Sequence, residues 1–137
     1  MDKSRNNRLT EKLREAFSLV EVLAAITIIG IITFLAVPNI VRVKQDGEEN
    51  LARARAETLN MAIASYVQAV GTNTAQTEWS NAASANARYQ KIAPYIAFAE
   101  TNLTLFTPAG YTNTLPTTIS PLTTKVIING PNGAVNY

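Results

Sequence analysis

The chain contains no cysteine and no histidine among its 137 residues. Without cysteine there is no disulfide and no thiol nucleophile, and without histidine the commonest general base and a frequent zinc ligand are missing. After Gly71 the only acidic residues are Glu78 and Glu100, which are too few to build a calcium site in the usual way. We therefore expect no enzymatic activity, no metal site and no cofactor.

The charge of the chain is concentrated at its N-terminus. The formal net charge is +2, and residues 1–16 carry five basic and three acidic side chains, so the remainder of the chain is balanced. Outside this segment no concentrated basic face is encoded. This distribution argues against a nucleic acid as the main partner.

A long apolar run follows the basic segment. Residues 17–37 carry one charged side chain, Glu21, and at 1.5 Å per residue a helix of that length spans roughly 31 Å, about one hydrocarbon core. Five basic residues precede the run, and Arg42 and Lys44 follow it closely. The excess on the N-terminal side predicts a cytoplasmic N-terminus and an exported C-terminal part. These features alone also fit a plain signal anchor.

Glu21 is the unexpected residue of the run. A carboxylate at the centre of a membrane helix costs about 2.5–3.5 kcal/mol on insertion scales. A cost of that size indicates a specific partner for the side chain. The simpler interpretation is that Glu21 lies close enough to the headgroups to reach water.

The basic leader, the stretch "AFSLVEVLAAITIIG" from Ala16 and the proline at position 38 together resemble type IV pilin-like proteins, a class that includes type II secretion pseudopilins. The resemblance is strong over residues 15–39 and continues to Gly71. It implies that a prepilin peptidase cuts the bond between Ala16 and Phe17 and that Phe17 is then N-methylated. The family usually has glycine before the cut. An uncut leader on a non-polymerising, membrane-anchored binding module is therefore the alternative.

The resemblance also implies a partner for Glu21, which matches the near-invariant glutamate of the family. Cutting exposes an α-amino group on Phe17, and this ammonium pairs with the glutamate of a neighbouring subunit during assembly. Two groups that are each costly alone in lipid offset each other when they meet. The family also implies that the helix between Gly30 and Pro38 unwinds in an assembled filament, whereas proline chemistry alone predicts a static kink.

The function implied by the resemblance is that of a structural subunit of a type II secretion pseudopilus or type IV pilus-like filament. The implied partners are other copies in a homo-oligomeric helical filament, the prepilin peptidase and methyltransferase, an inner-membrane assembly platform with its ATPase, minor pseudopilins and membrane lipid. The implied location is the bacterial inner membrane, crossed once, with the N-terminus cytoplasmic and the C-terminal domain periplasmic.

The expected fold is α+β and pilin-like, with a long N-terminal helix whose first half is transmembrane, packed on a small antiparallel sheet. We divide the chain into a leader (1–16), a transmembrane or filament-core helix (17–38), an exported amphipathic half of that helix (39–71) and a small α+β domain (72–137). The helix is expected to end at Gly71, a typical C′ residue. Its predicted packing stripe follows steps of three and four: Ala52, Ala56, Leu59, Ile63, Tyr66 or Val67, and Val70. Glu49, Arg53 and Glu57 are expected to interact along another face.

Beyond this helix the sequence predicts smaller elements. Residues 72–77 are expected to form a polar loop and residues 77–98 a short helix that Pro94 ends or kinks. Its predicted packing face comprises Trp79, Ala83, Ala87 and Ile92, with Trp79 as a core residue. Residues 101–137 are rich in threonine, asparagine, proline and glycine, which favours strands and turns. We expect three or four antiparallel strands there, with a turn at residues 129–133.

Overall fold

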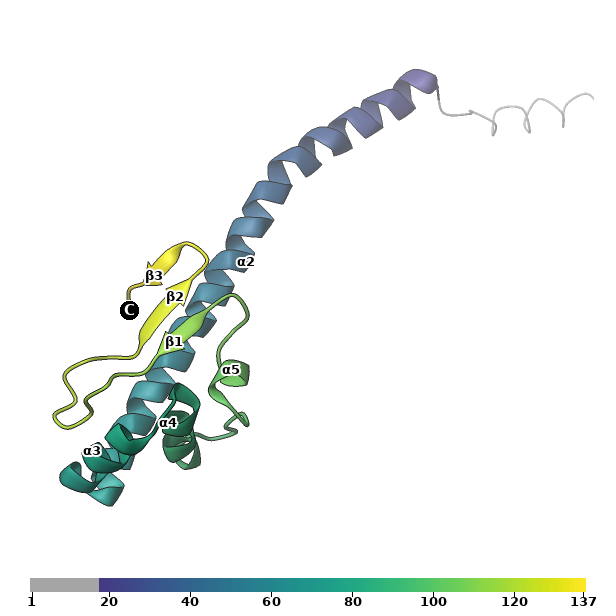
Figure 1. Cartoon of the computed structure of the whole chain (residues 1–137). Coiled ribbons are helices and arrows are strands. Elements are labelled where there is room, and N and C mark those ends of the chain that lie inside the picture. The colour runs from purple at the N-terminus through teal and green to yellow at the C-terminus, as the bar shows by residue number, and fades with distance from the viewer. Residues whose placement is uncertain (1–17) are drawn as a thin grey trace, which may run out of the picture. The chain divides into compact units, whose positions relative to one another are not determined.

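The computed structural model describes residues 18–137, and every structural statement below refers to these residues. Figure 1 shows a long helix, α2 (Leu19–Val70), followed by α3 (Thr72–Asn81), α4 (Ala85–Ile92), the 3-10 turn η1 (Ala93–Tyr95), α5 (Leu103–Phe106), β1 (Thr112–Thr114), β2 (Ile127–Gly130) and β3 (Gly133–Val135). The chain divides into two compact units, one ending at Arg42 and the other spanning Val43–Tyr137. The predicted α+β class, a long apolar N-terminal helix with a small antiparallel sheet, is confirmed.

Helix α2 runs for 52 residues without a break. It continues through Pro38 and through two glycines, Gly30 and Gly47. It ends at Val70, where Gly71 takes a positive φ of 90° and its N–H donates to the Val67 carbonyl at 3.0 Å. The predicted end of the helix is therefore confirmed, because glycine adopts this left-handed conformation without a Cβ penalty. A kink or unwinding between Gly30 and Pro38 stays a prediction.

The core of the second unit is built on one stripe of α2. The predicted positions are buried at Ala52, Ala56, Leu59, Ile63 and Tyr66, with Val67 and Val70 partly buried against the same cluster. Each fully buried aliphatic side chain such as Leu59 contributes roughly 1.5–3 kcal/mol relative to exposure.

The polar loop predicted for residues 72–77 is wrong, because helix α3 begins at Thr72. Ala75 and Trp79, four residues apart, share one face of this helix and are both fully buried. The indole N–H of Trp79 donates to the Pro116 carbonyl at 2.8 Å. Burial of this face, rather than intrinsic propensity, holds a threonine- and asparagine-rich segment in a helix. Trp79 is confirmed as a core residue.

The single helix predicted for residues 77–98 is split into two helices and a turn. The Ser84 hydroxyl accepts a hydrogen bond from the Ala87 N–H at 3.1 Å and caps the start of α4. This new start changes the phase of the buried face. Tyr89 and Ile92 are buried, whereas Ala83 is exposed, so the predicted packing face is correct only at its ends.

Helix α5 lies within the region predicted to contain strands and turns only. The side chain of Asn102 accepts a hydrogen bond from the Leu105 N–H at 2.8 Å and caps this single turn. Leu103 and Phe106 are buried on its inner face. The local cap and two buried side chains thus override the β-favouring composition of the segment.

The sheet has the order β1-β2-β3, and both pairs are antiparallel. Asn113 pairs with Ile128 across β1 and β2, and Ile128 pairs with Val135 across β2 and β3. Ile128 is fully buried in the core cluster that contains the α2 stripe. The predicted turn between the last two strands is confirmed, with Gly130 and Gly133 paired across it.

Candidate functional site

The structure locates three of the five predicted site residues. Ala16 and Phe17, predicted for leader cleavage, N-methylation and assembly, lie outside the described residues. Glu21, Gly30 and Pro38 are all in helix α2, eight or nine residues apart. At 1.5 Å per residue these intervals are roughly 12–14 Å, so the three residues do not form one compact site.

Glu21 forms a capping box with Ser18 at the start of α2. The Ser18 N–H donates to Glu21 Oε2 at 2.8 Å, and the Glu21 N–H donates to Ser18 Oγ at 3.2 Å. Each side chain therefore satisfies one of the backbone donors that a helix start leaves unpaired. A carboxylate in the first turn also interacts favourably with the helix dipole.

Sequence reasoning missed the role of Ser18, although the Ser-x-x-Glu spacing could have revealed it. The cap occupies one carboxylate oxygen: among the described residues, only Oε2 of Glu21 accepts a hydrogen bond. Both residues are exposed. Glu21 is therefore oriented by its own chain while its second oxygen stays available to another donor.

The remainder of the apolar run presents hydrocarbon to its surroundings. By length and composition, α2 is the one described helix that is apolar enough to cross a membrane, and none of its most apolar window is buried. The hydroxyls of Thr27 and Thr33 donate to the carbonyls of Leu23 and Ile29, each at 2.7 Å. These hydroxyls need no water, which suits a helix in an apolar medium.

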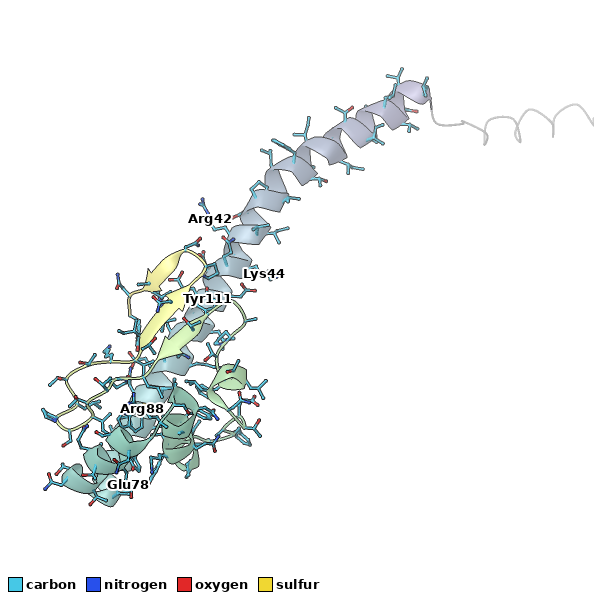
Figure 2. All side chains as sticks on the ribbon, in the orientation of Figure 1. Arg42, Lys44, Glu78, Arg88 and Tyr111 are labelled. Atoms are coloured by element: carbon cyan, nitrogen blue, oxygen red, sulfur yellow. The ribbon has the colours of Figure 1, made fainter. Side chains whose placement is uncertain are left out.

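The second unit carries a small charged network next to its core. The Tyr66 hydroxyl donates to Glu78 Oε2 at 2.6 Å, and Lys91 Nζ lies 3.1 Å from the same oxygen. The hydrogen bond from Tyr66, followed by Lys91, lowers the pKa of Glu78. Desolvation by burial, followed by the interaction with Glu78, raises the pKa of Tyr66. Figure 2 shows Glu78 at the end of the second unit where α3 lies. The network links α2, α3 and α4.

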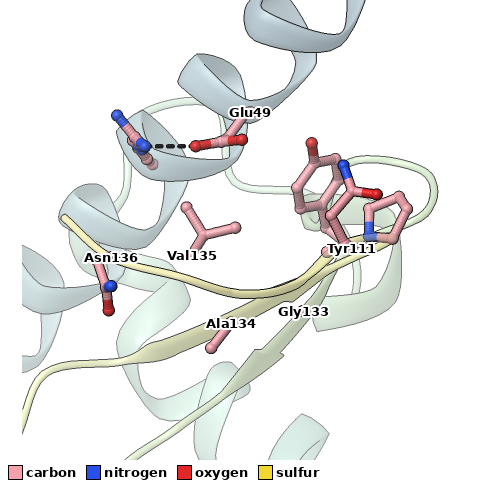
Figure 3. Close-up of a pocket in the computed structure, with 10 residues that line it drawn as sticks. Glu49, Tyr111, Gly133, Ala134, Val135 and Asn136 are labelled. Carbon is pink, nitrogen blue, oxygen red and sulfur yellow. Dashed lines mark hydrogen bonds and ion pairs between the residues drawn. The ribbon is translucent and has the colours of Figure 1, made fainter.

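A hollow of about 260 Å³ lies between α2 and the β2–β3 turn (Figure 3). Arg53 donates to Glu49 on one wall, as the i, i+4 spacing predicted, while Glu57 pairs instead with Lys125 at 3.2 Å. Tyr111 closes another side, and desolvation raises the pKa of its hydroxyl. Within residues 18–137 no three carboxylate, thiol or imidazole groups gather closely enough to hold a metal ion. This hollow offers hydrogen bonds and one ion pair, but no nucleophile paired with a base.

Comparisons with known proteins identify no relative of this chain. The chain matches no protein-family model, no curated protein and no solved structure. The fold class therefore rests on the structure, and the likeness to pilins rests on the sequence, where it is strong over residues 15–39 and continues to Gly71.

Proposed function

We propose that this chain is a structural subunit of a filament of the pseudopilus or type IV pilus kind. In this proposal it is inserted once in the bacterial inner membrane, with the second unit exported to the periplasm. A prepilin peptidase trims it between Ala16 and Phe17, and Phe17 is methylated. The assembly platform, its ATPase and minor subunits then add it to a growing helical filament.

The observation that carries the proposal is the sequence pattern of the basic leader, Phe17, Glu21 and Pro38, and the uninterrupted helix α2 supports it. The first part of this helix exposes an apolar surface that needs either lipid or other helices around it. Its last part buries a stripe under a small α+β domain. One helix with these two surfaces is suited to a subunit that leaves the bilayer for the core of a polymer without refolding its exported domain.

The capping box refines the proposed role of Glu21. Its Oε2 is held by Ser18, so the carboxylate has a defined orientation before any partner arrives. The α-amino group that cleavage would expose on Phe17 is largely protonated at neutral pH. A neighbouring ammonium can therefore meet an oriented carboxylate through its other oxygen. Such a pairing would offset the cost of both charges in an apolar medium and set the axial register between helices.

N-terminal sequencing of the protein extracted from membranes is the first test. An N-terminus at Phe17, with an N-methyl group detected by mass spectrometry, is expected. Recovery of the chain from Met1 would instead favour a non-polymerising, anchored binding module. Ala16 is the residue that supports this alternative, because the family usually carries glycine there.

A second test addresses polymerisation itself. Glu21→Ala is expected to insert in the membrane and to fold its exported unit normally, but to assemble poorly. Sheared filaments would be quantified by electron microscopy and immunoblotting. Assembly as efficient as that of the unaltered chain would remove the register role of Glu21.

A further inference from the structure

We propose that Phe98 of one copy inserts into an apolar hollow beside Leu122 on a second copy, forming a head-to-tail contact between exported units. Nothing in the proposed role of Glu21 requires this contact. The inference rests on the proposed function, since it adds a contact between exported units to the same assembly.

Phe98 is the most unusual side chain of the second unit. It lies between η1 and α5, and its aromatic ring is fully exposed to solvent. Its φ is 56°, and it is the only non-glycine residue with a positive φ among residues 18–137. A bulky residue in this conformation is strained, and a fully exposed aromatic ring buries no surface that would stabilise its own unit. Its position is therefore explained better by a partner than by the stability of the unit.

A receptor for the ring is present elsewhere on the same unit. The hollow has a volume of about 230 Å³ and lies between the end of α2 and the loop that joins β1 to β2. None of its lining residues is charged, and its apolar walls comprise Ala64, Val67, Ile119, Pro121 and Leu122. An apolar cavity of about 150 Å³ holds a benzene molecule, so the volume is sufficient for a phenyl ring. Leu122 is 40% exposed and available to a partner.

Charges beside the two surfaces are complementary. Glu100 is exposed two residues after Phe98, and its carboxylate makes no ion pair with a described residue. Lys125, three residues after Leu122, lies in an adjoining hollow that Leu122 also lines. Its ammonium donates to Glu57 at 3.2 Å and to the Tyr137 carbonyl at 3.4 Å, and its side chain is 59% exposed, so its third N–H can donate to a second carboxylate. A docked Phe98 would bring Glu100 toward this ammonium.

The two surfaces are carried by segments on different sides of α2. In Figure 1 the segment leading into α5 lies on one side of the helix, and the loop between β1 and β2 lies on the other. In one contact the Phe98 ring of the first copy occupies the hollow of the second copy. The hollow of the first copy and the ring of the second copy therefore remain free. Such a heterologous contact joins successive copies head to tail, into a ring if the rotation between copies closes and into an open helical chain if it does not. A twofold contact between two Phe98 side chains would stop at two copies.

Cysteine crosslinking tests the contact in the full-length chain, because the protein has no cysteine of its own. A double variant with Ala99→Cys and Thr123→Cys, two exposed positions next to the contact that leave the Phe98 ring and the hollow intact, would be oxidised in membranes, and in parallel treated with a short bis-maleimide that tolerates imperfect disulfide geometry. We expect a ladder of dimers, trimers and larger multimers on non-reducing gels, with the oxidised ladder lost on reduction. Each single variant should remain monomeric. The matched control combines Leu105→Cys with Thr123→Cys, since Leu105 is an exposed apolar residue of α5 outside the proposed contact.

Three results would overturn the inference: no ladder with either reagent, an equal ladder from the Leu105 control, or dimers from Ala99→Cys alone. Fluorescence of Trp79 would show that each variant is folded, because this buried tryptophan is the only one in the chain. Phe98→Asn provides a second check, since asparagine tolerates a positive φ but removes the ring. It should keep the fold and reduce filament yield several-fold, whereas Leu105→Asn should not. The proposed function is judged separately: wild-type filaments without the ladder refute only the contact, and a ladder without filaments refutes only the filament.

Discussion

The side-chain amide of Asn60, on α2, donates a hydrogen bond to the hydroxyl of Tyr137 at 3.1 Å. The Tyr137 hydroxyl donates to the Val126 carbonyl, and the Val126 N–H donates back to Asn60 Oδ1 at 2.9 Å. Three residues far apart in sequence thus close a ring of hydrogen bonds. The ring joins the long helix to the start of β2 and to the chain beyond β3.

Asn60→Ala should destabilise the exported unit by about 1–3 kcal/mol, because Val126 and Tyr137 each lose a partner in a partly buried place. Thermal unfolding of the full chain in detergent, followed by Trp79 fluorescence, would measure the change. Tyr137→Phe should cost less, about 0.5–1.5 kcal/mol, since the ring remains in place. Asn50→Ala, at an exposed position of the same helix, is the matched control and should change little. Equal effects at positions 50 and 60 would contradict the structural role of the hydrogen-bond ring.

Glu78 should make stability depend on pH in the acid range. Its folded-state pKa is lowered, so its contribution is fully present above the unfolded value of 4.5 and is lost as the pH falls through the lower folded-state value. Glu78→Gln should therefore show a smaller drop in melting temperature than the wild type below pH 4.5. Asn50→Ala, which removes no titratable group, is the control and should keep the wild-type profile. Parallel curves for Glu78→Gln and the wild type would show that the Tyr66–Glu78–Lys91 network does not shift this titration.

Two glycine-to-alanine substitutions should have opposite effects. A Cβ on Gly130 would lie 2.6 Å from Cε1 of Tyr111, so Gly130→Ala should displace the ring and cost about 1–3 kcal/mol. A Cβ on Gly47 would meet nothing within 4 Å, so Gly47→Ala should stabilise α2 by about 0.5–1 kcal/mol. Melting temperatures measured in the same detergent would reveal the signs. A neutral Gly130→Ala would mean that Tyr111 moves aside without loss.

Substitutions at Ser18 and Glu21 should separate the effect of helix capping from the effect of charge on assembly. Ser18→Ala removes one capping hydrogen bond, at a cost of about 0.5–2 kcal/mol to the helix start, but leaves the carboxylate in place. Glu21→Gln keeps an oxygen that can accept from the Ser18 N–H but removes the charge. We expect filament yield to fall strongly with Glu21→Gln and only slightly with Ser18→Ala. Equal losses would show that the capping box, and not the charge, supports assembly.

The sequence was most informative where structure depends on local chemistry. The end of α2 follows from Gly71, and its buried stripe follows from apolar residues three and four positions apart. The turn between β2 and β3 follows from its glycines and asparagine. The cap of Ser18 on Glu21 was readable in the same way. The charge of Glu21 among apolar neighbours, however, predicted a partner in another subunit and not the cap with Ser18.

The remaining elements depend on contacts that no local pattern contains. Helix α3 forms because Ala75 and Trp79 find a buried surface, although the threonines and asparagines around them favour loops. Helix α5 is a single turn stabilised by Asn102 and by burial of Phe106. The order of the strands is likewise set by packing over long sequence distances. The Phe98 conformation has no sequence signature, because phenylalanine is disfavoured there.

The internal bonds of Thr27 and Thr33 have a consequence for how the apolar run could change its environment. Because their hydroxyls are already satisfied by the helix backbone, neither acyl chains nor neighbouring helices have to supply a hydrogen bond. Moving this segment from lipid to a surrounding of other apolar helices would therefore exchange one set of dispersion contacts for another. Such an exchange is close to neutral in energy, so its direction can be decided by a few polar groups at the helix start.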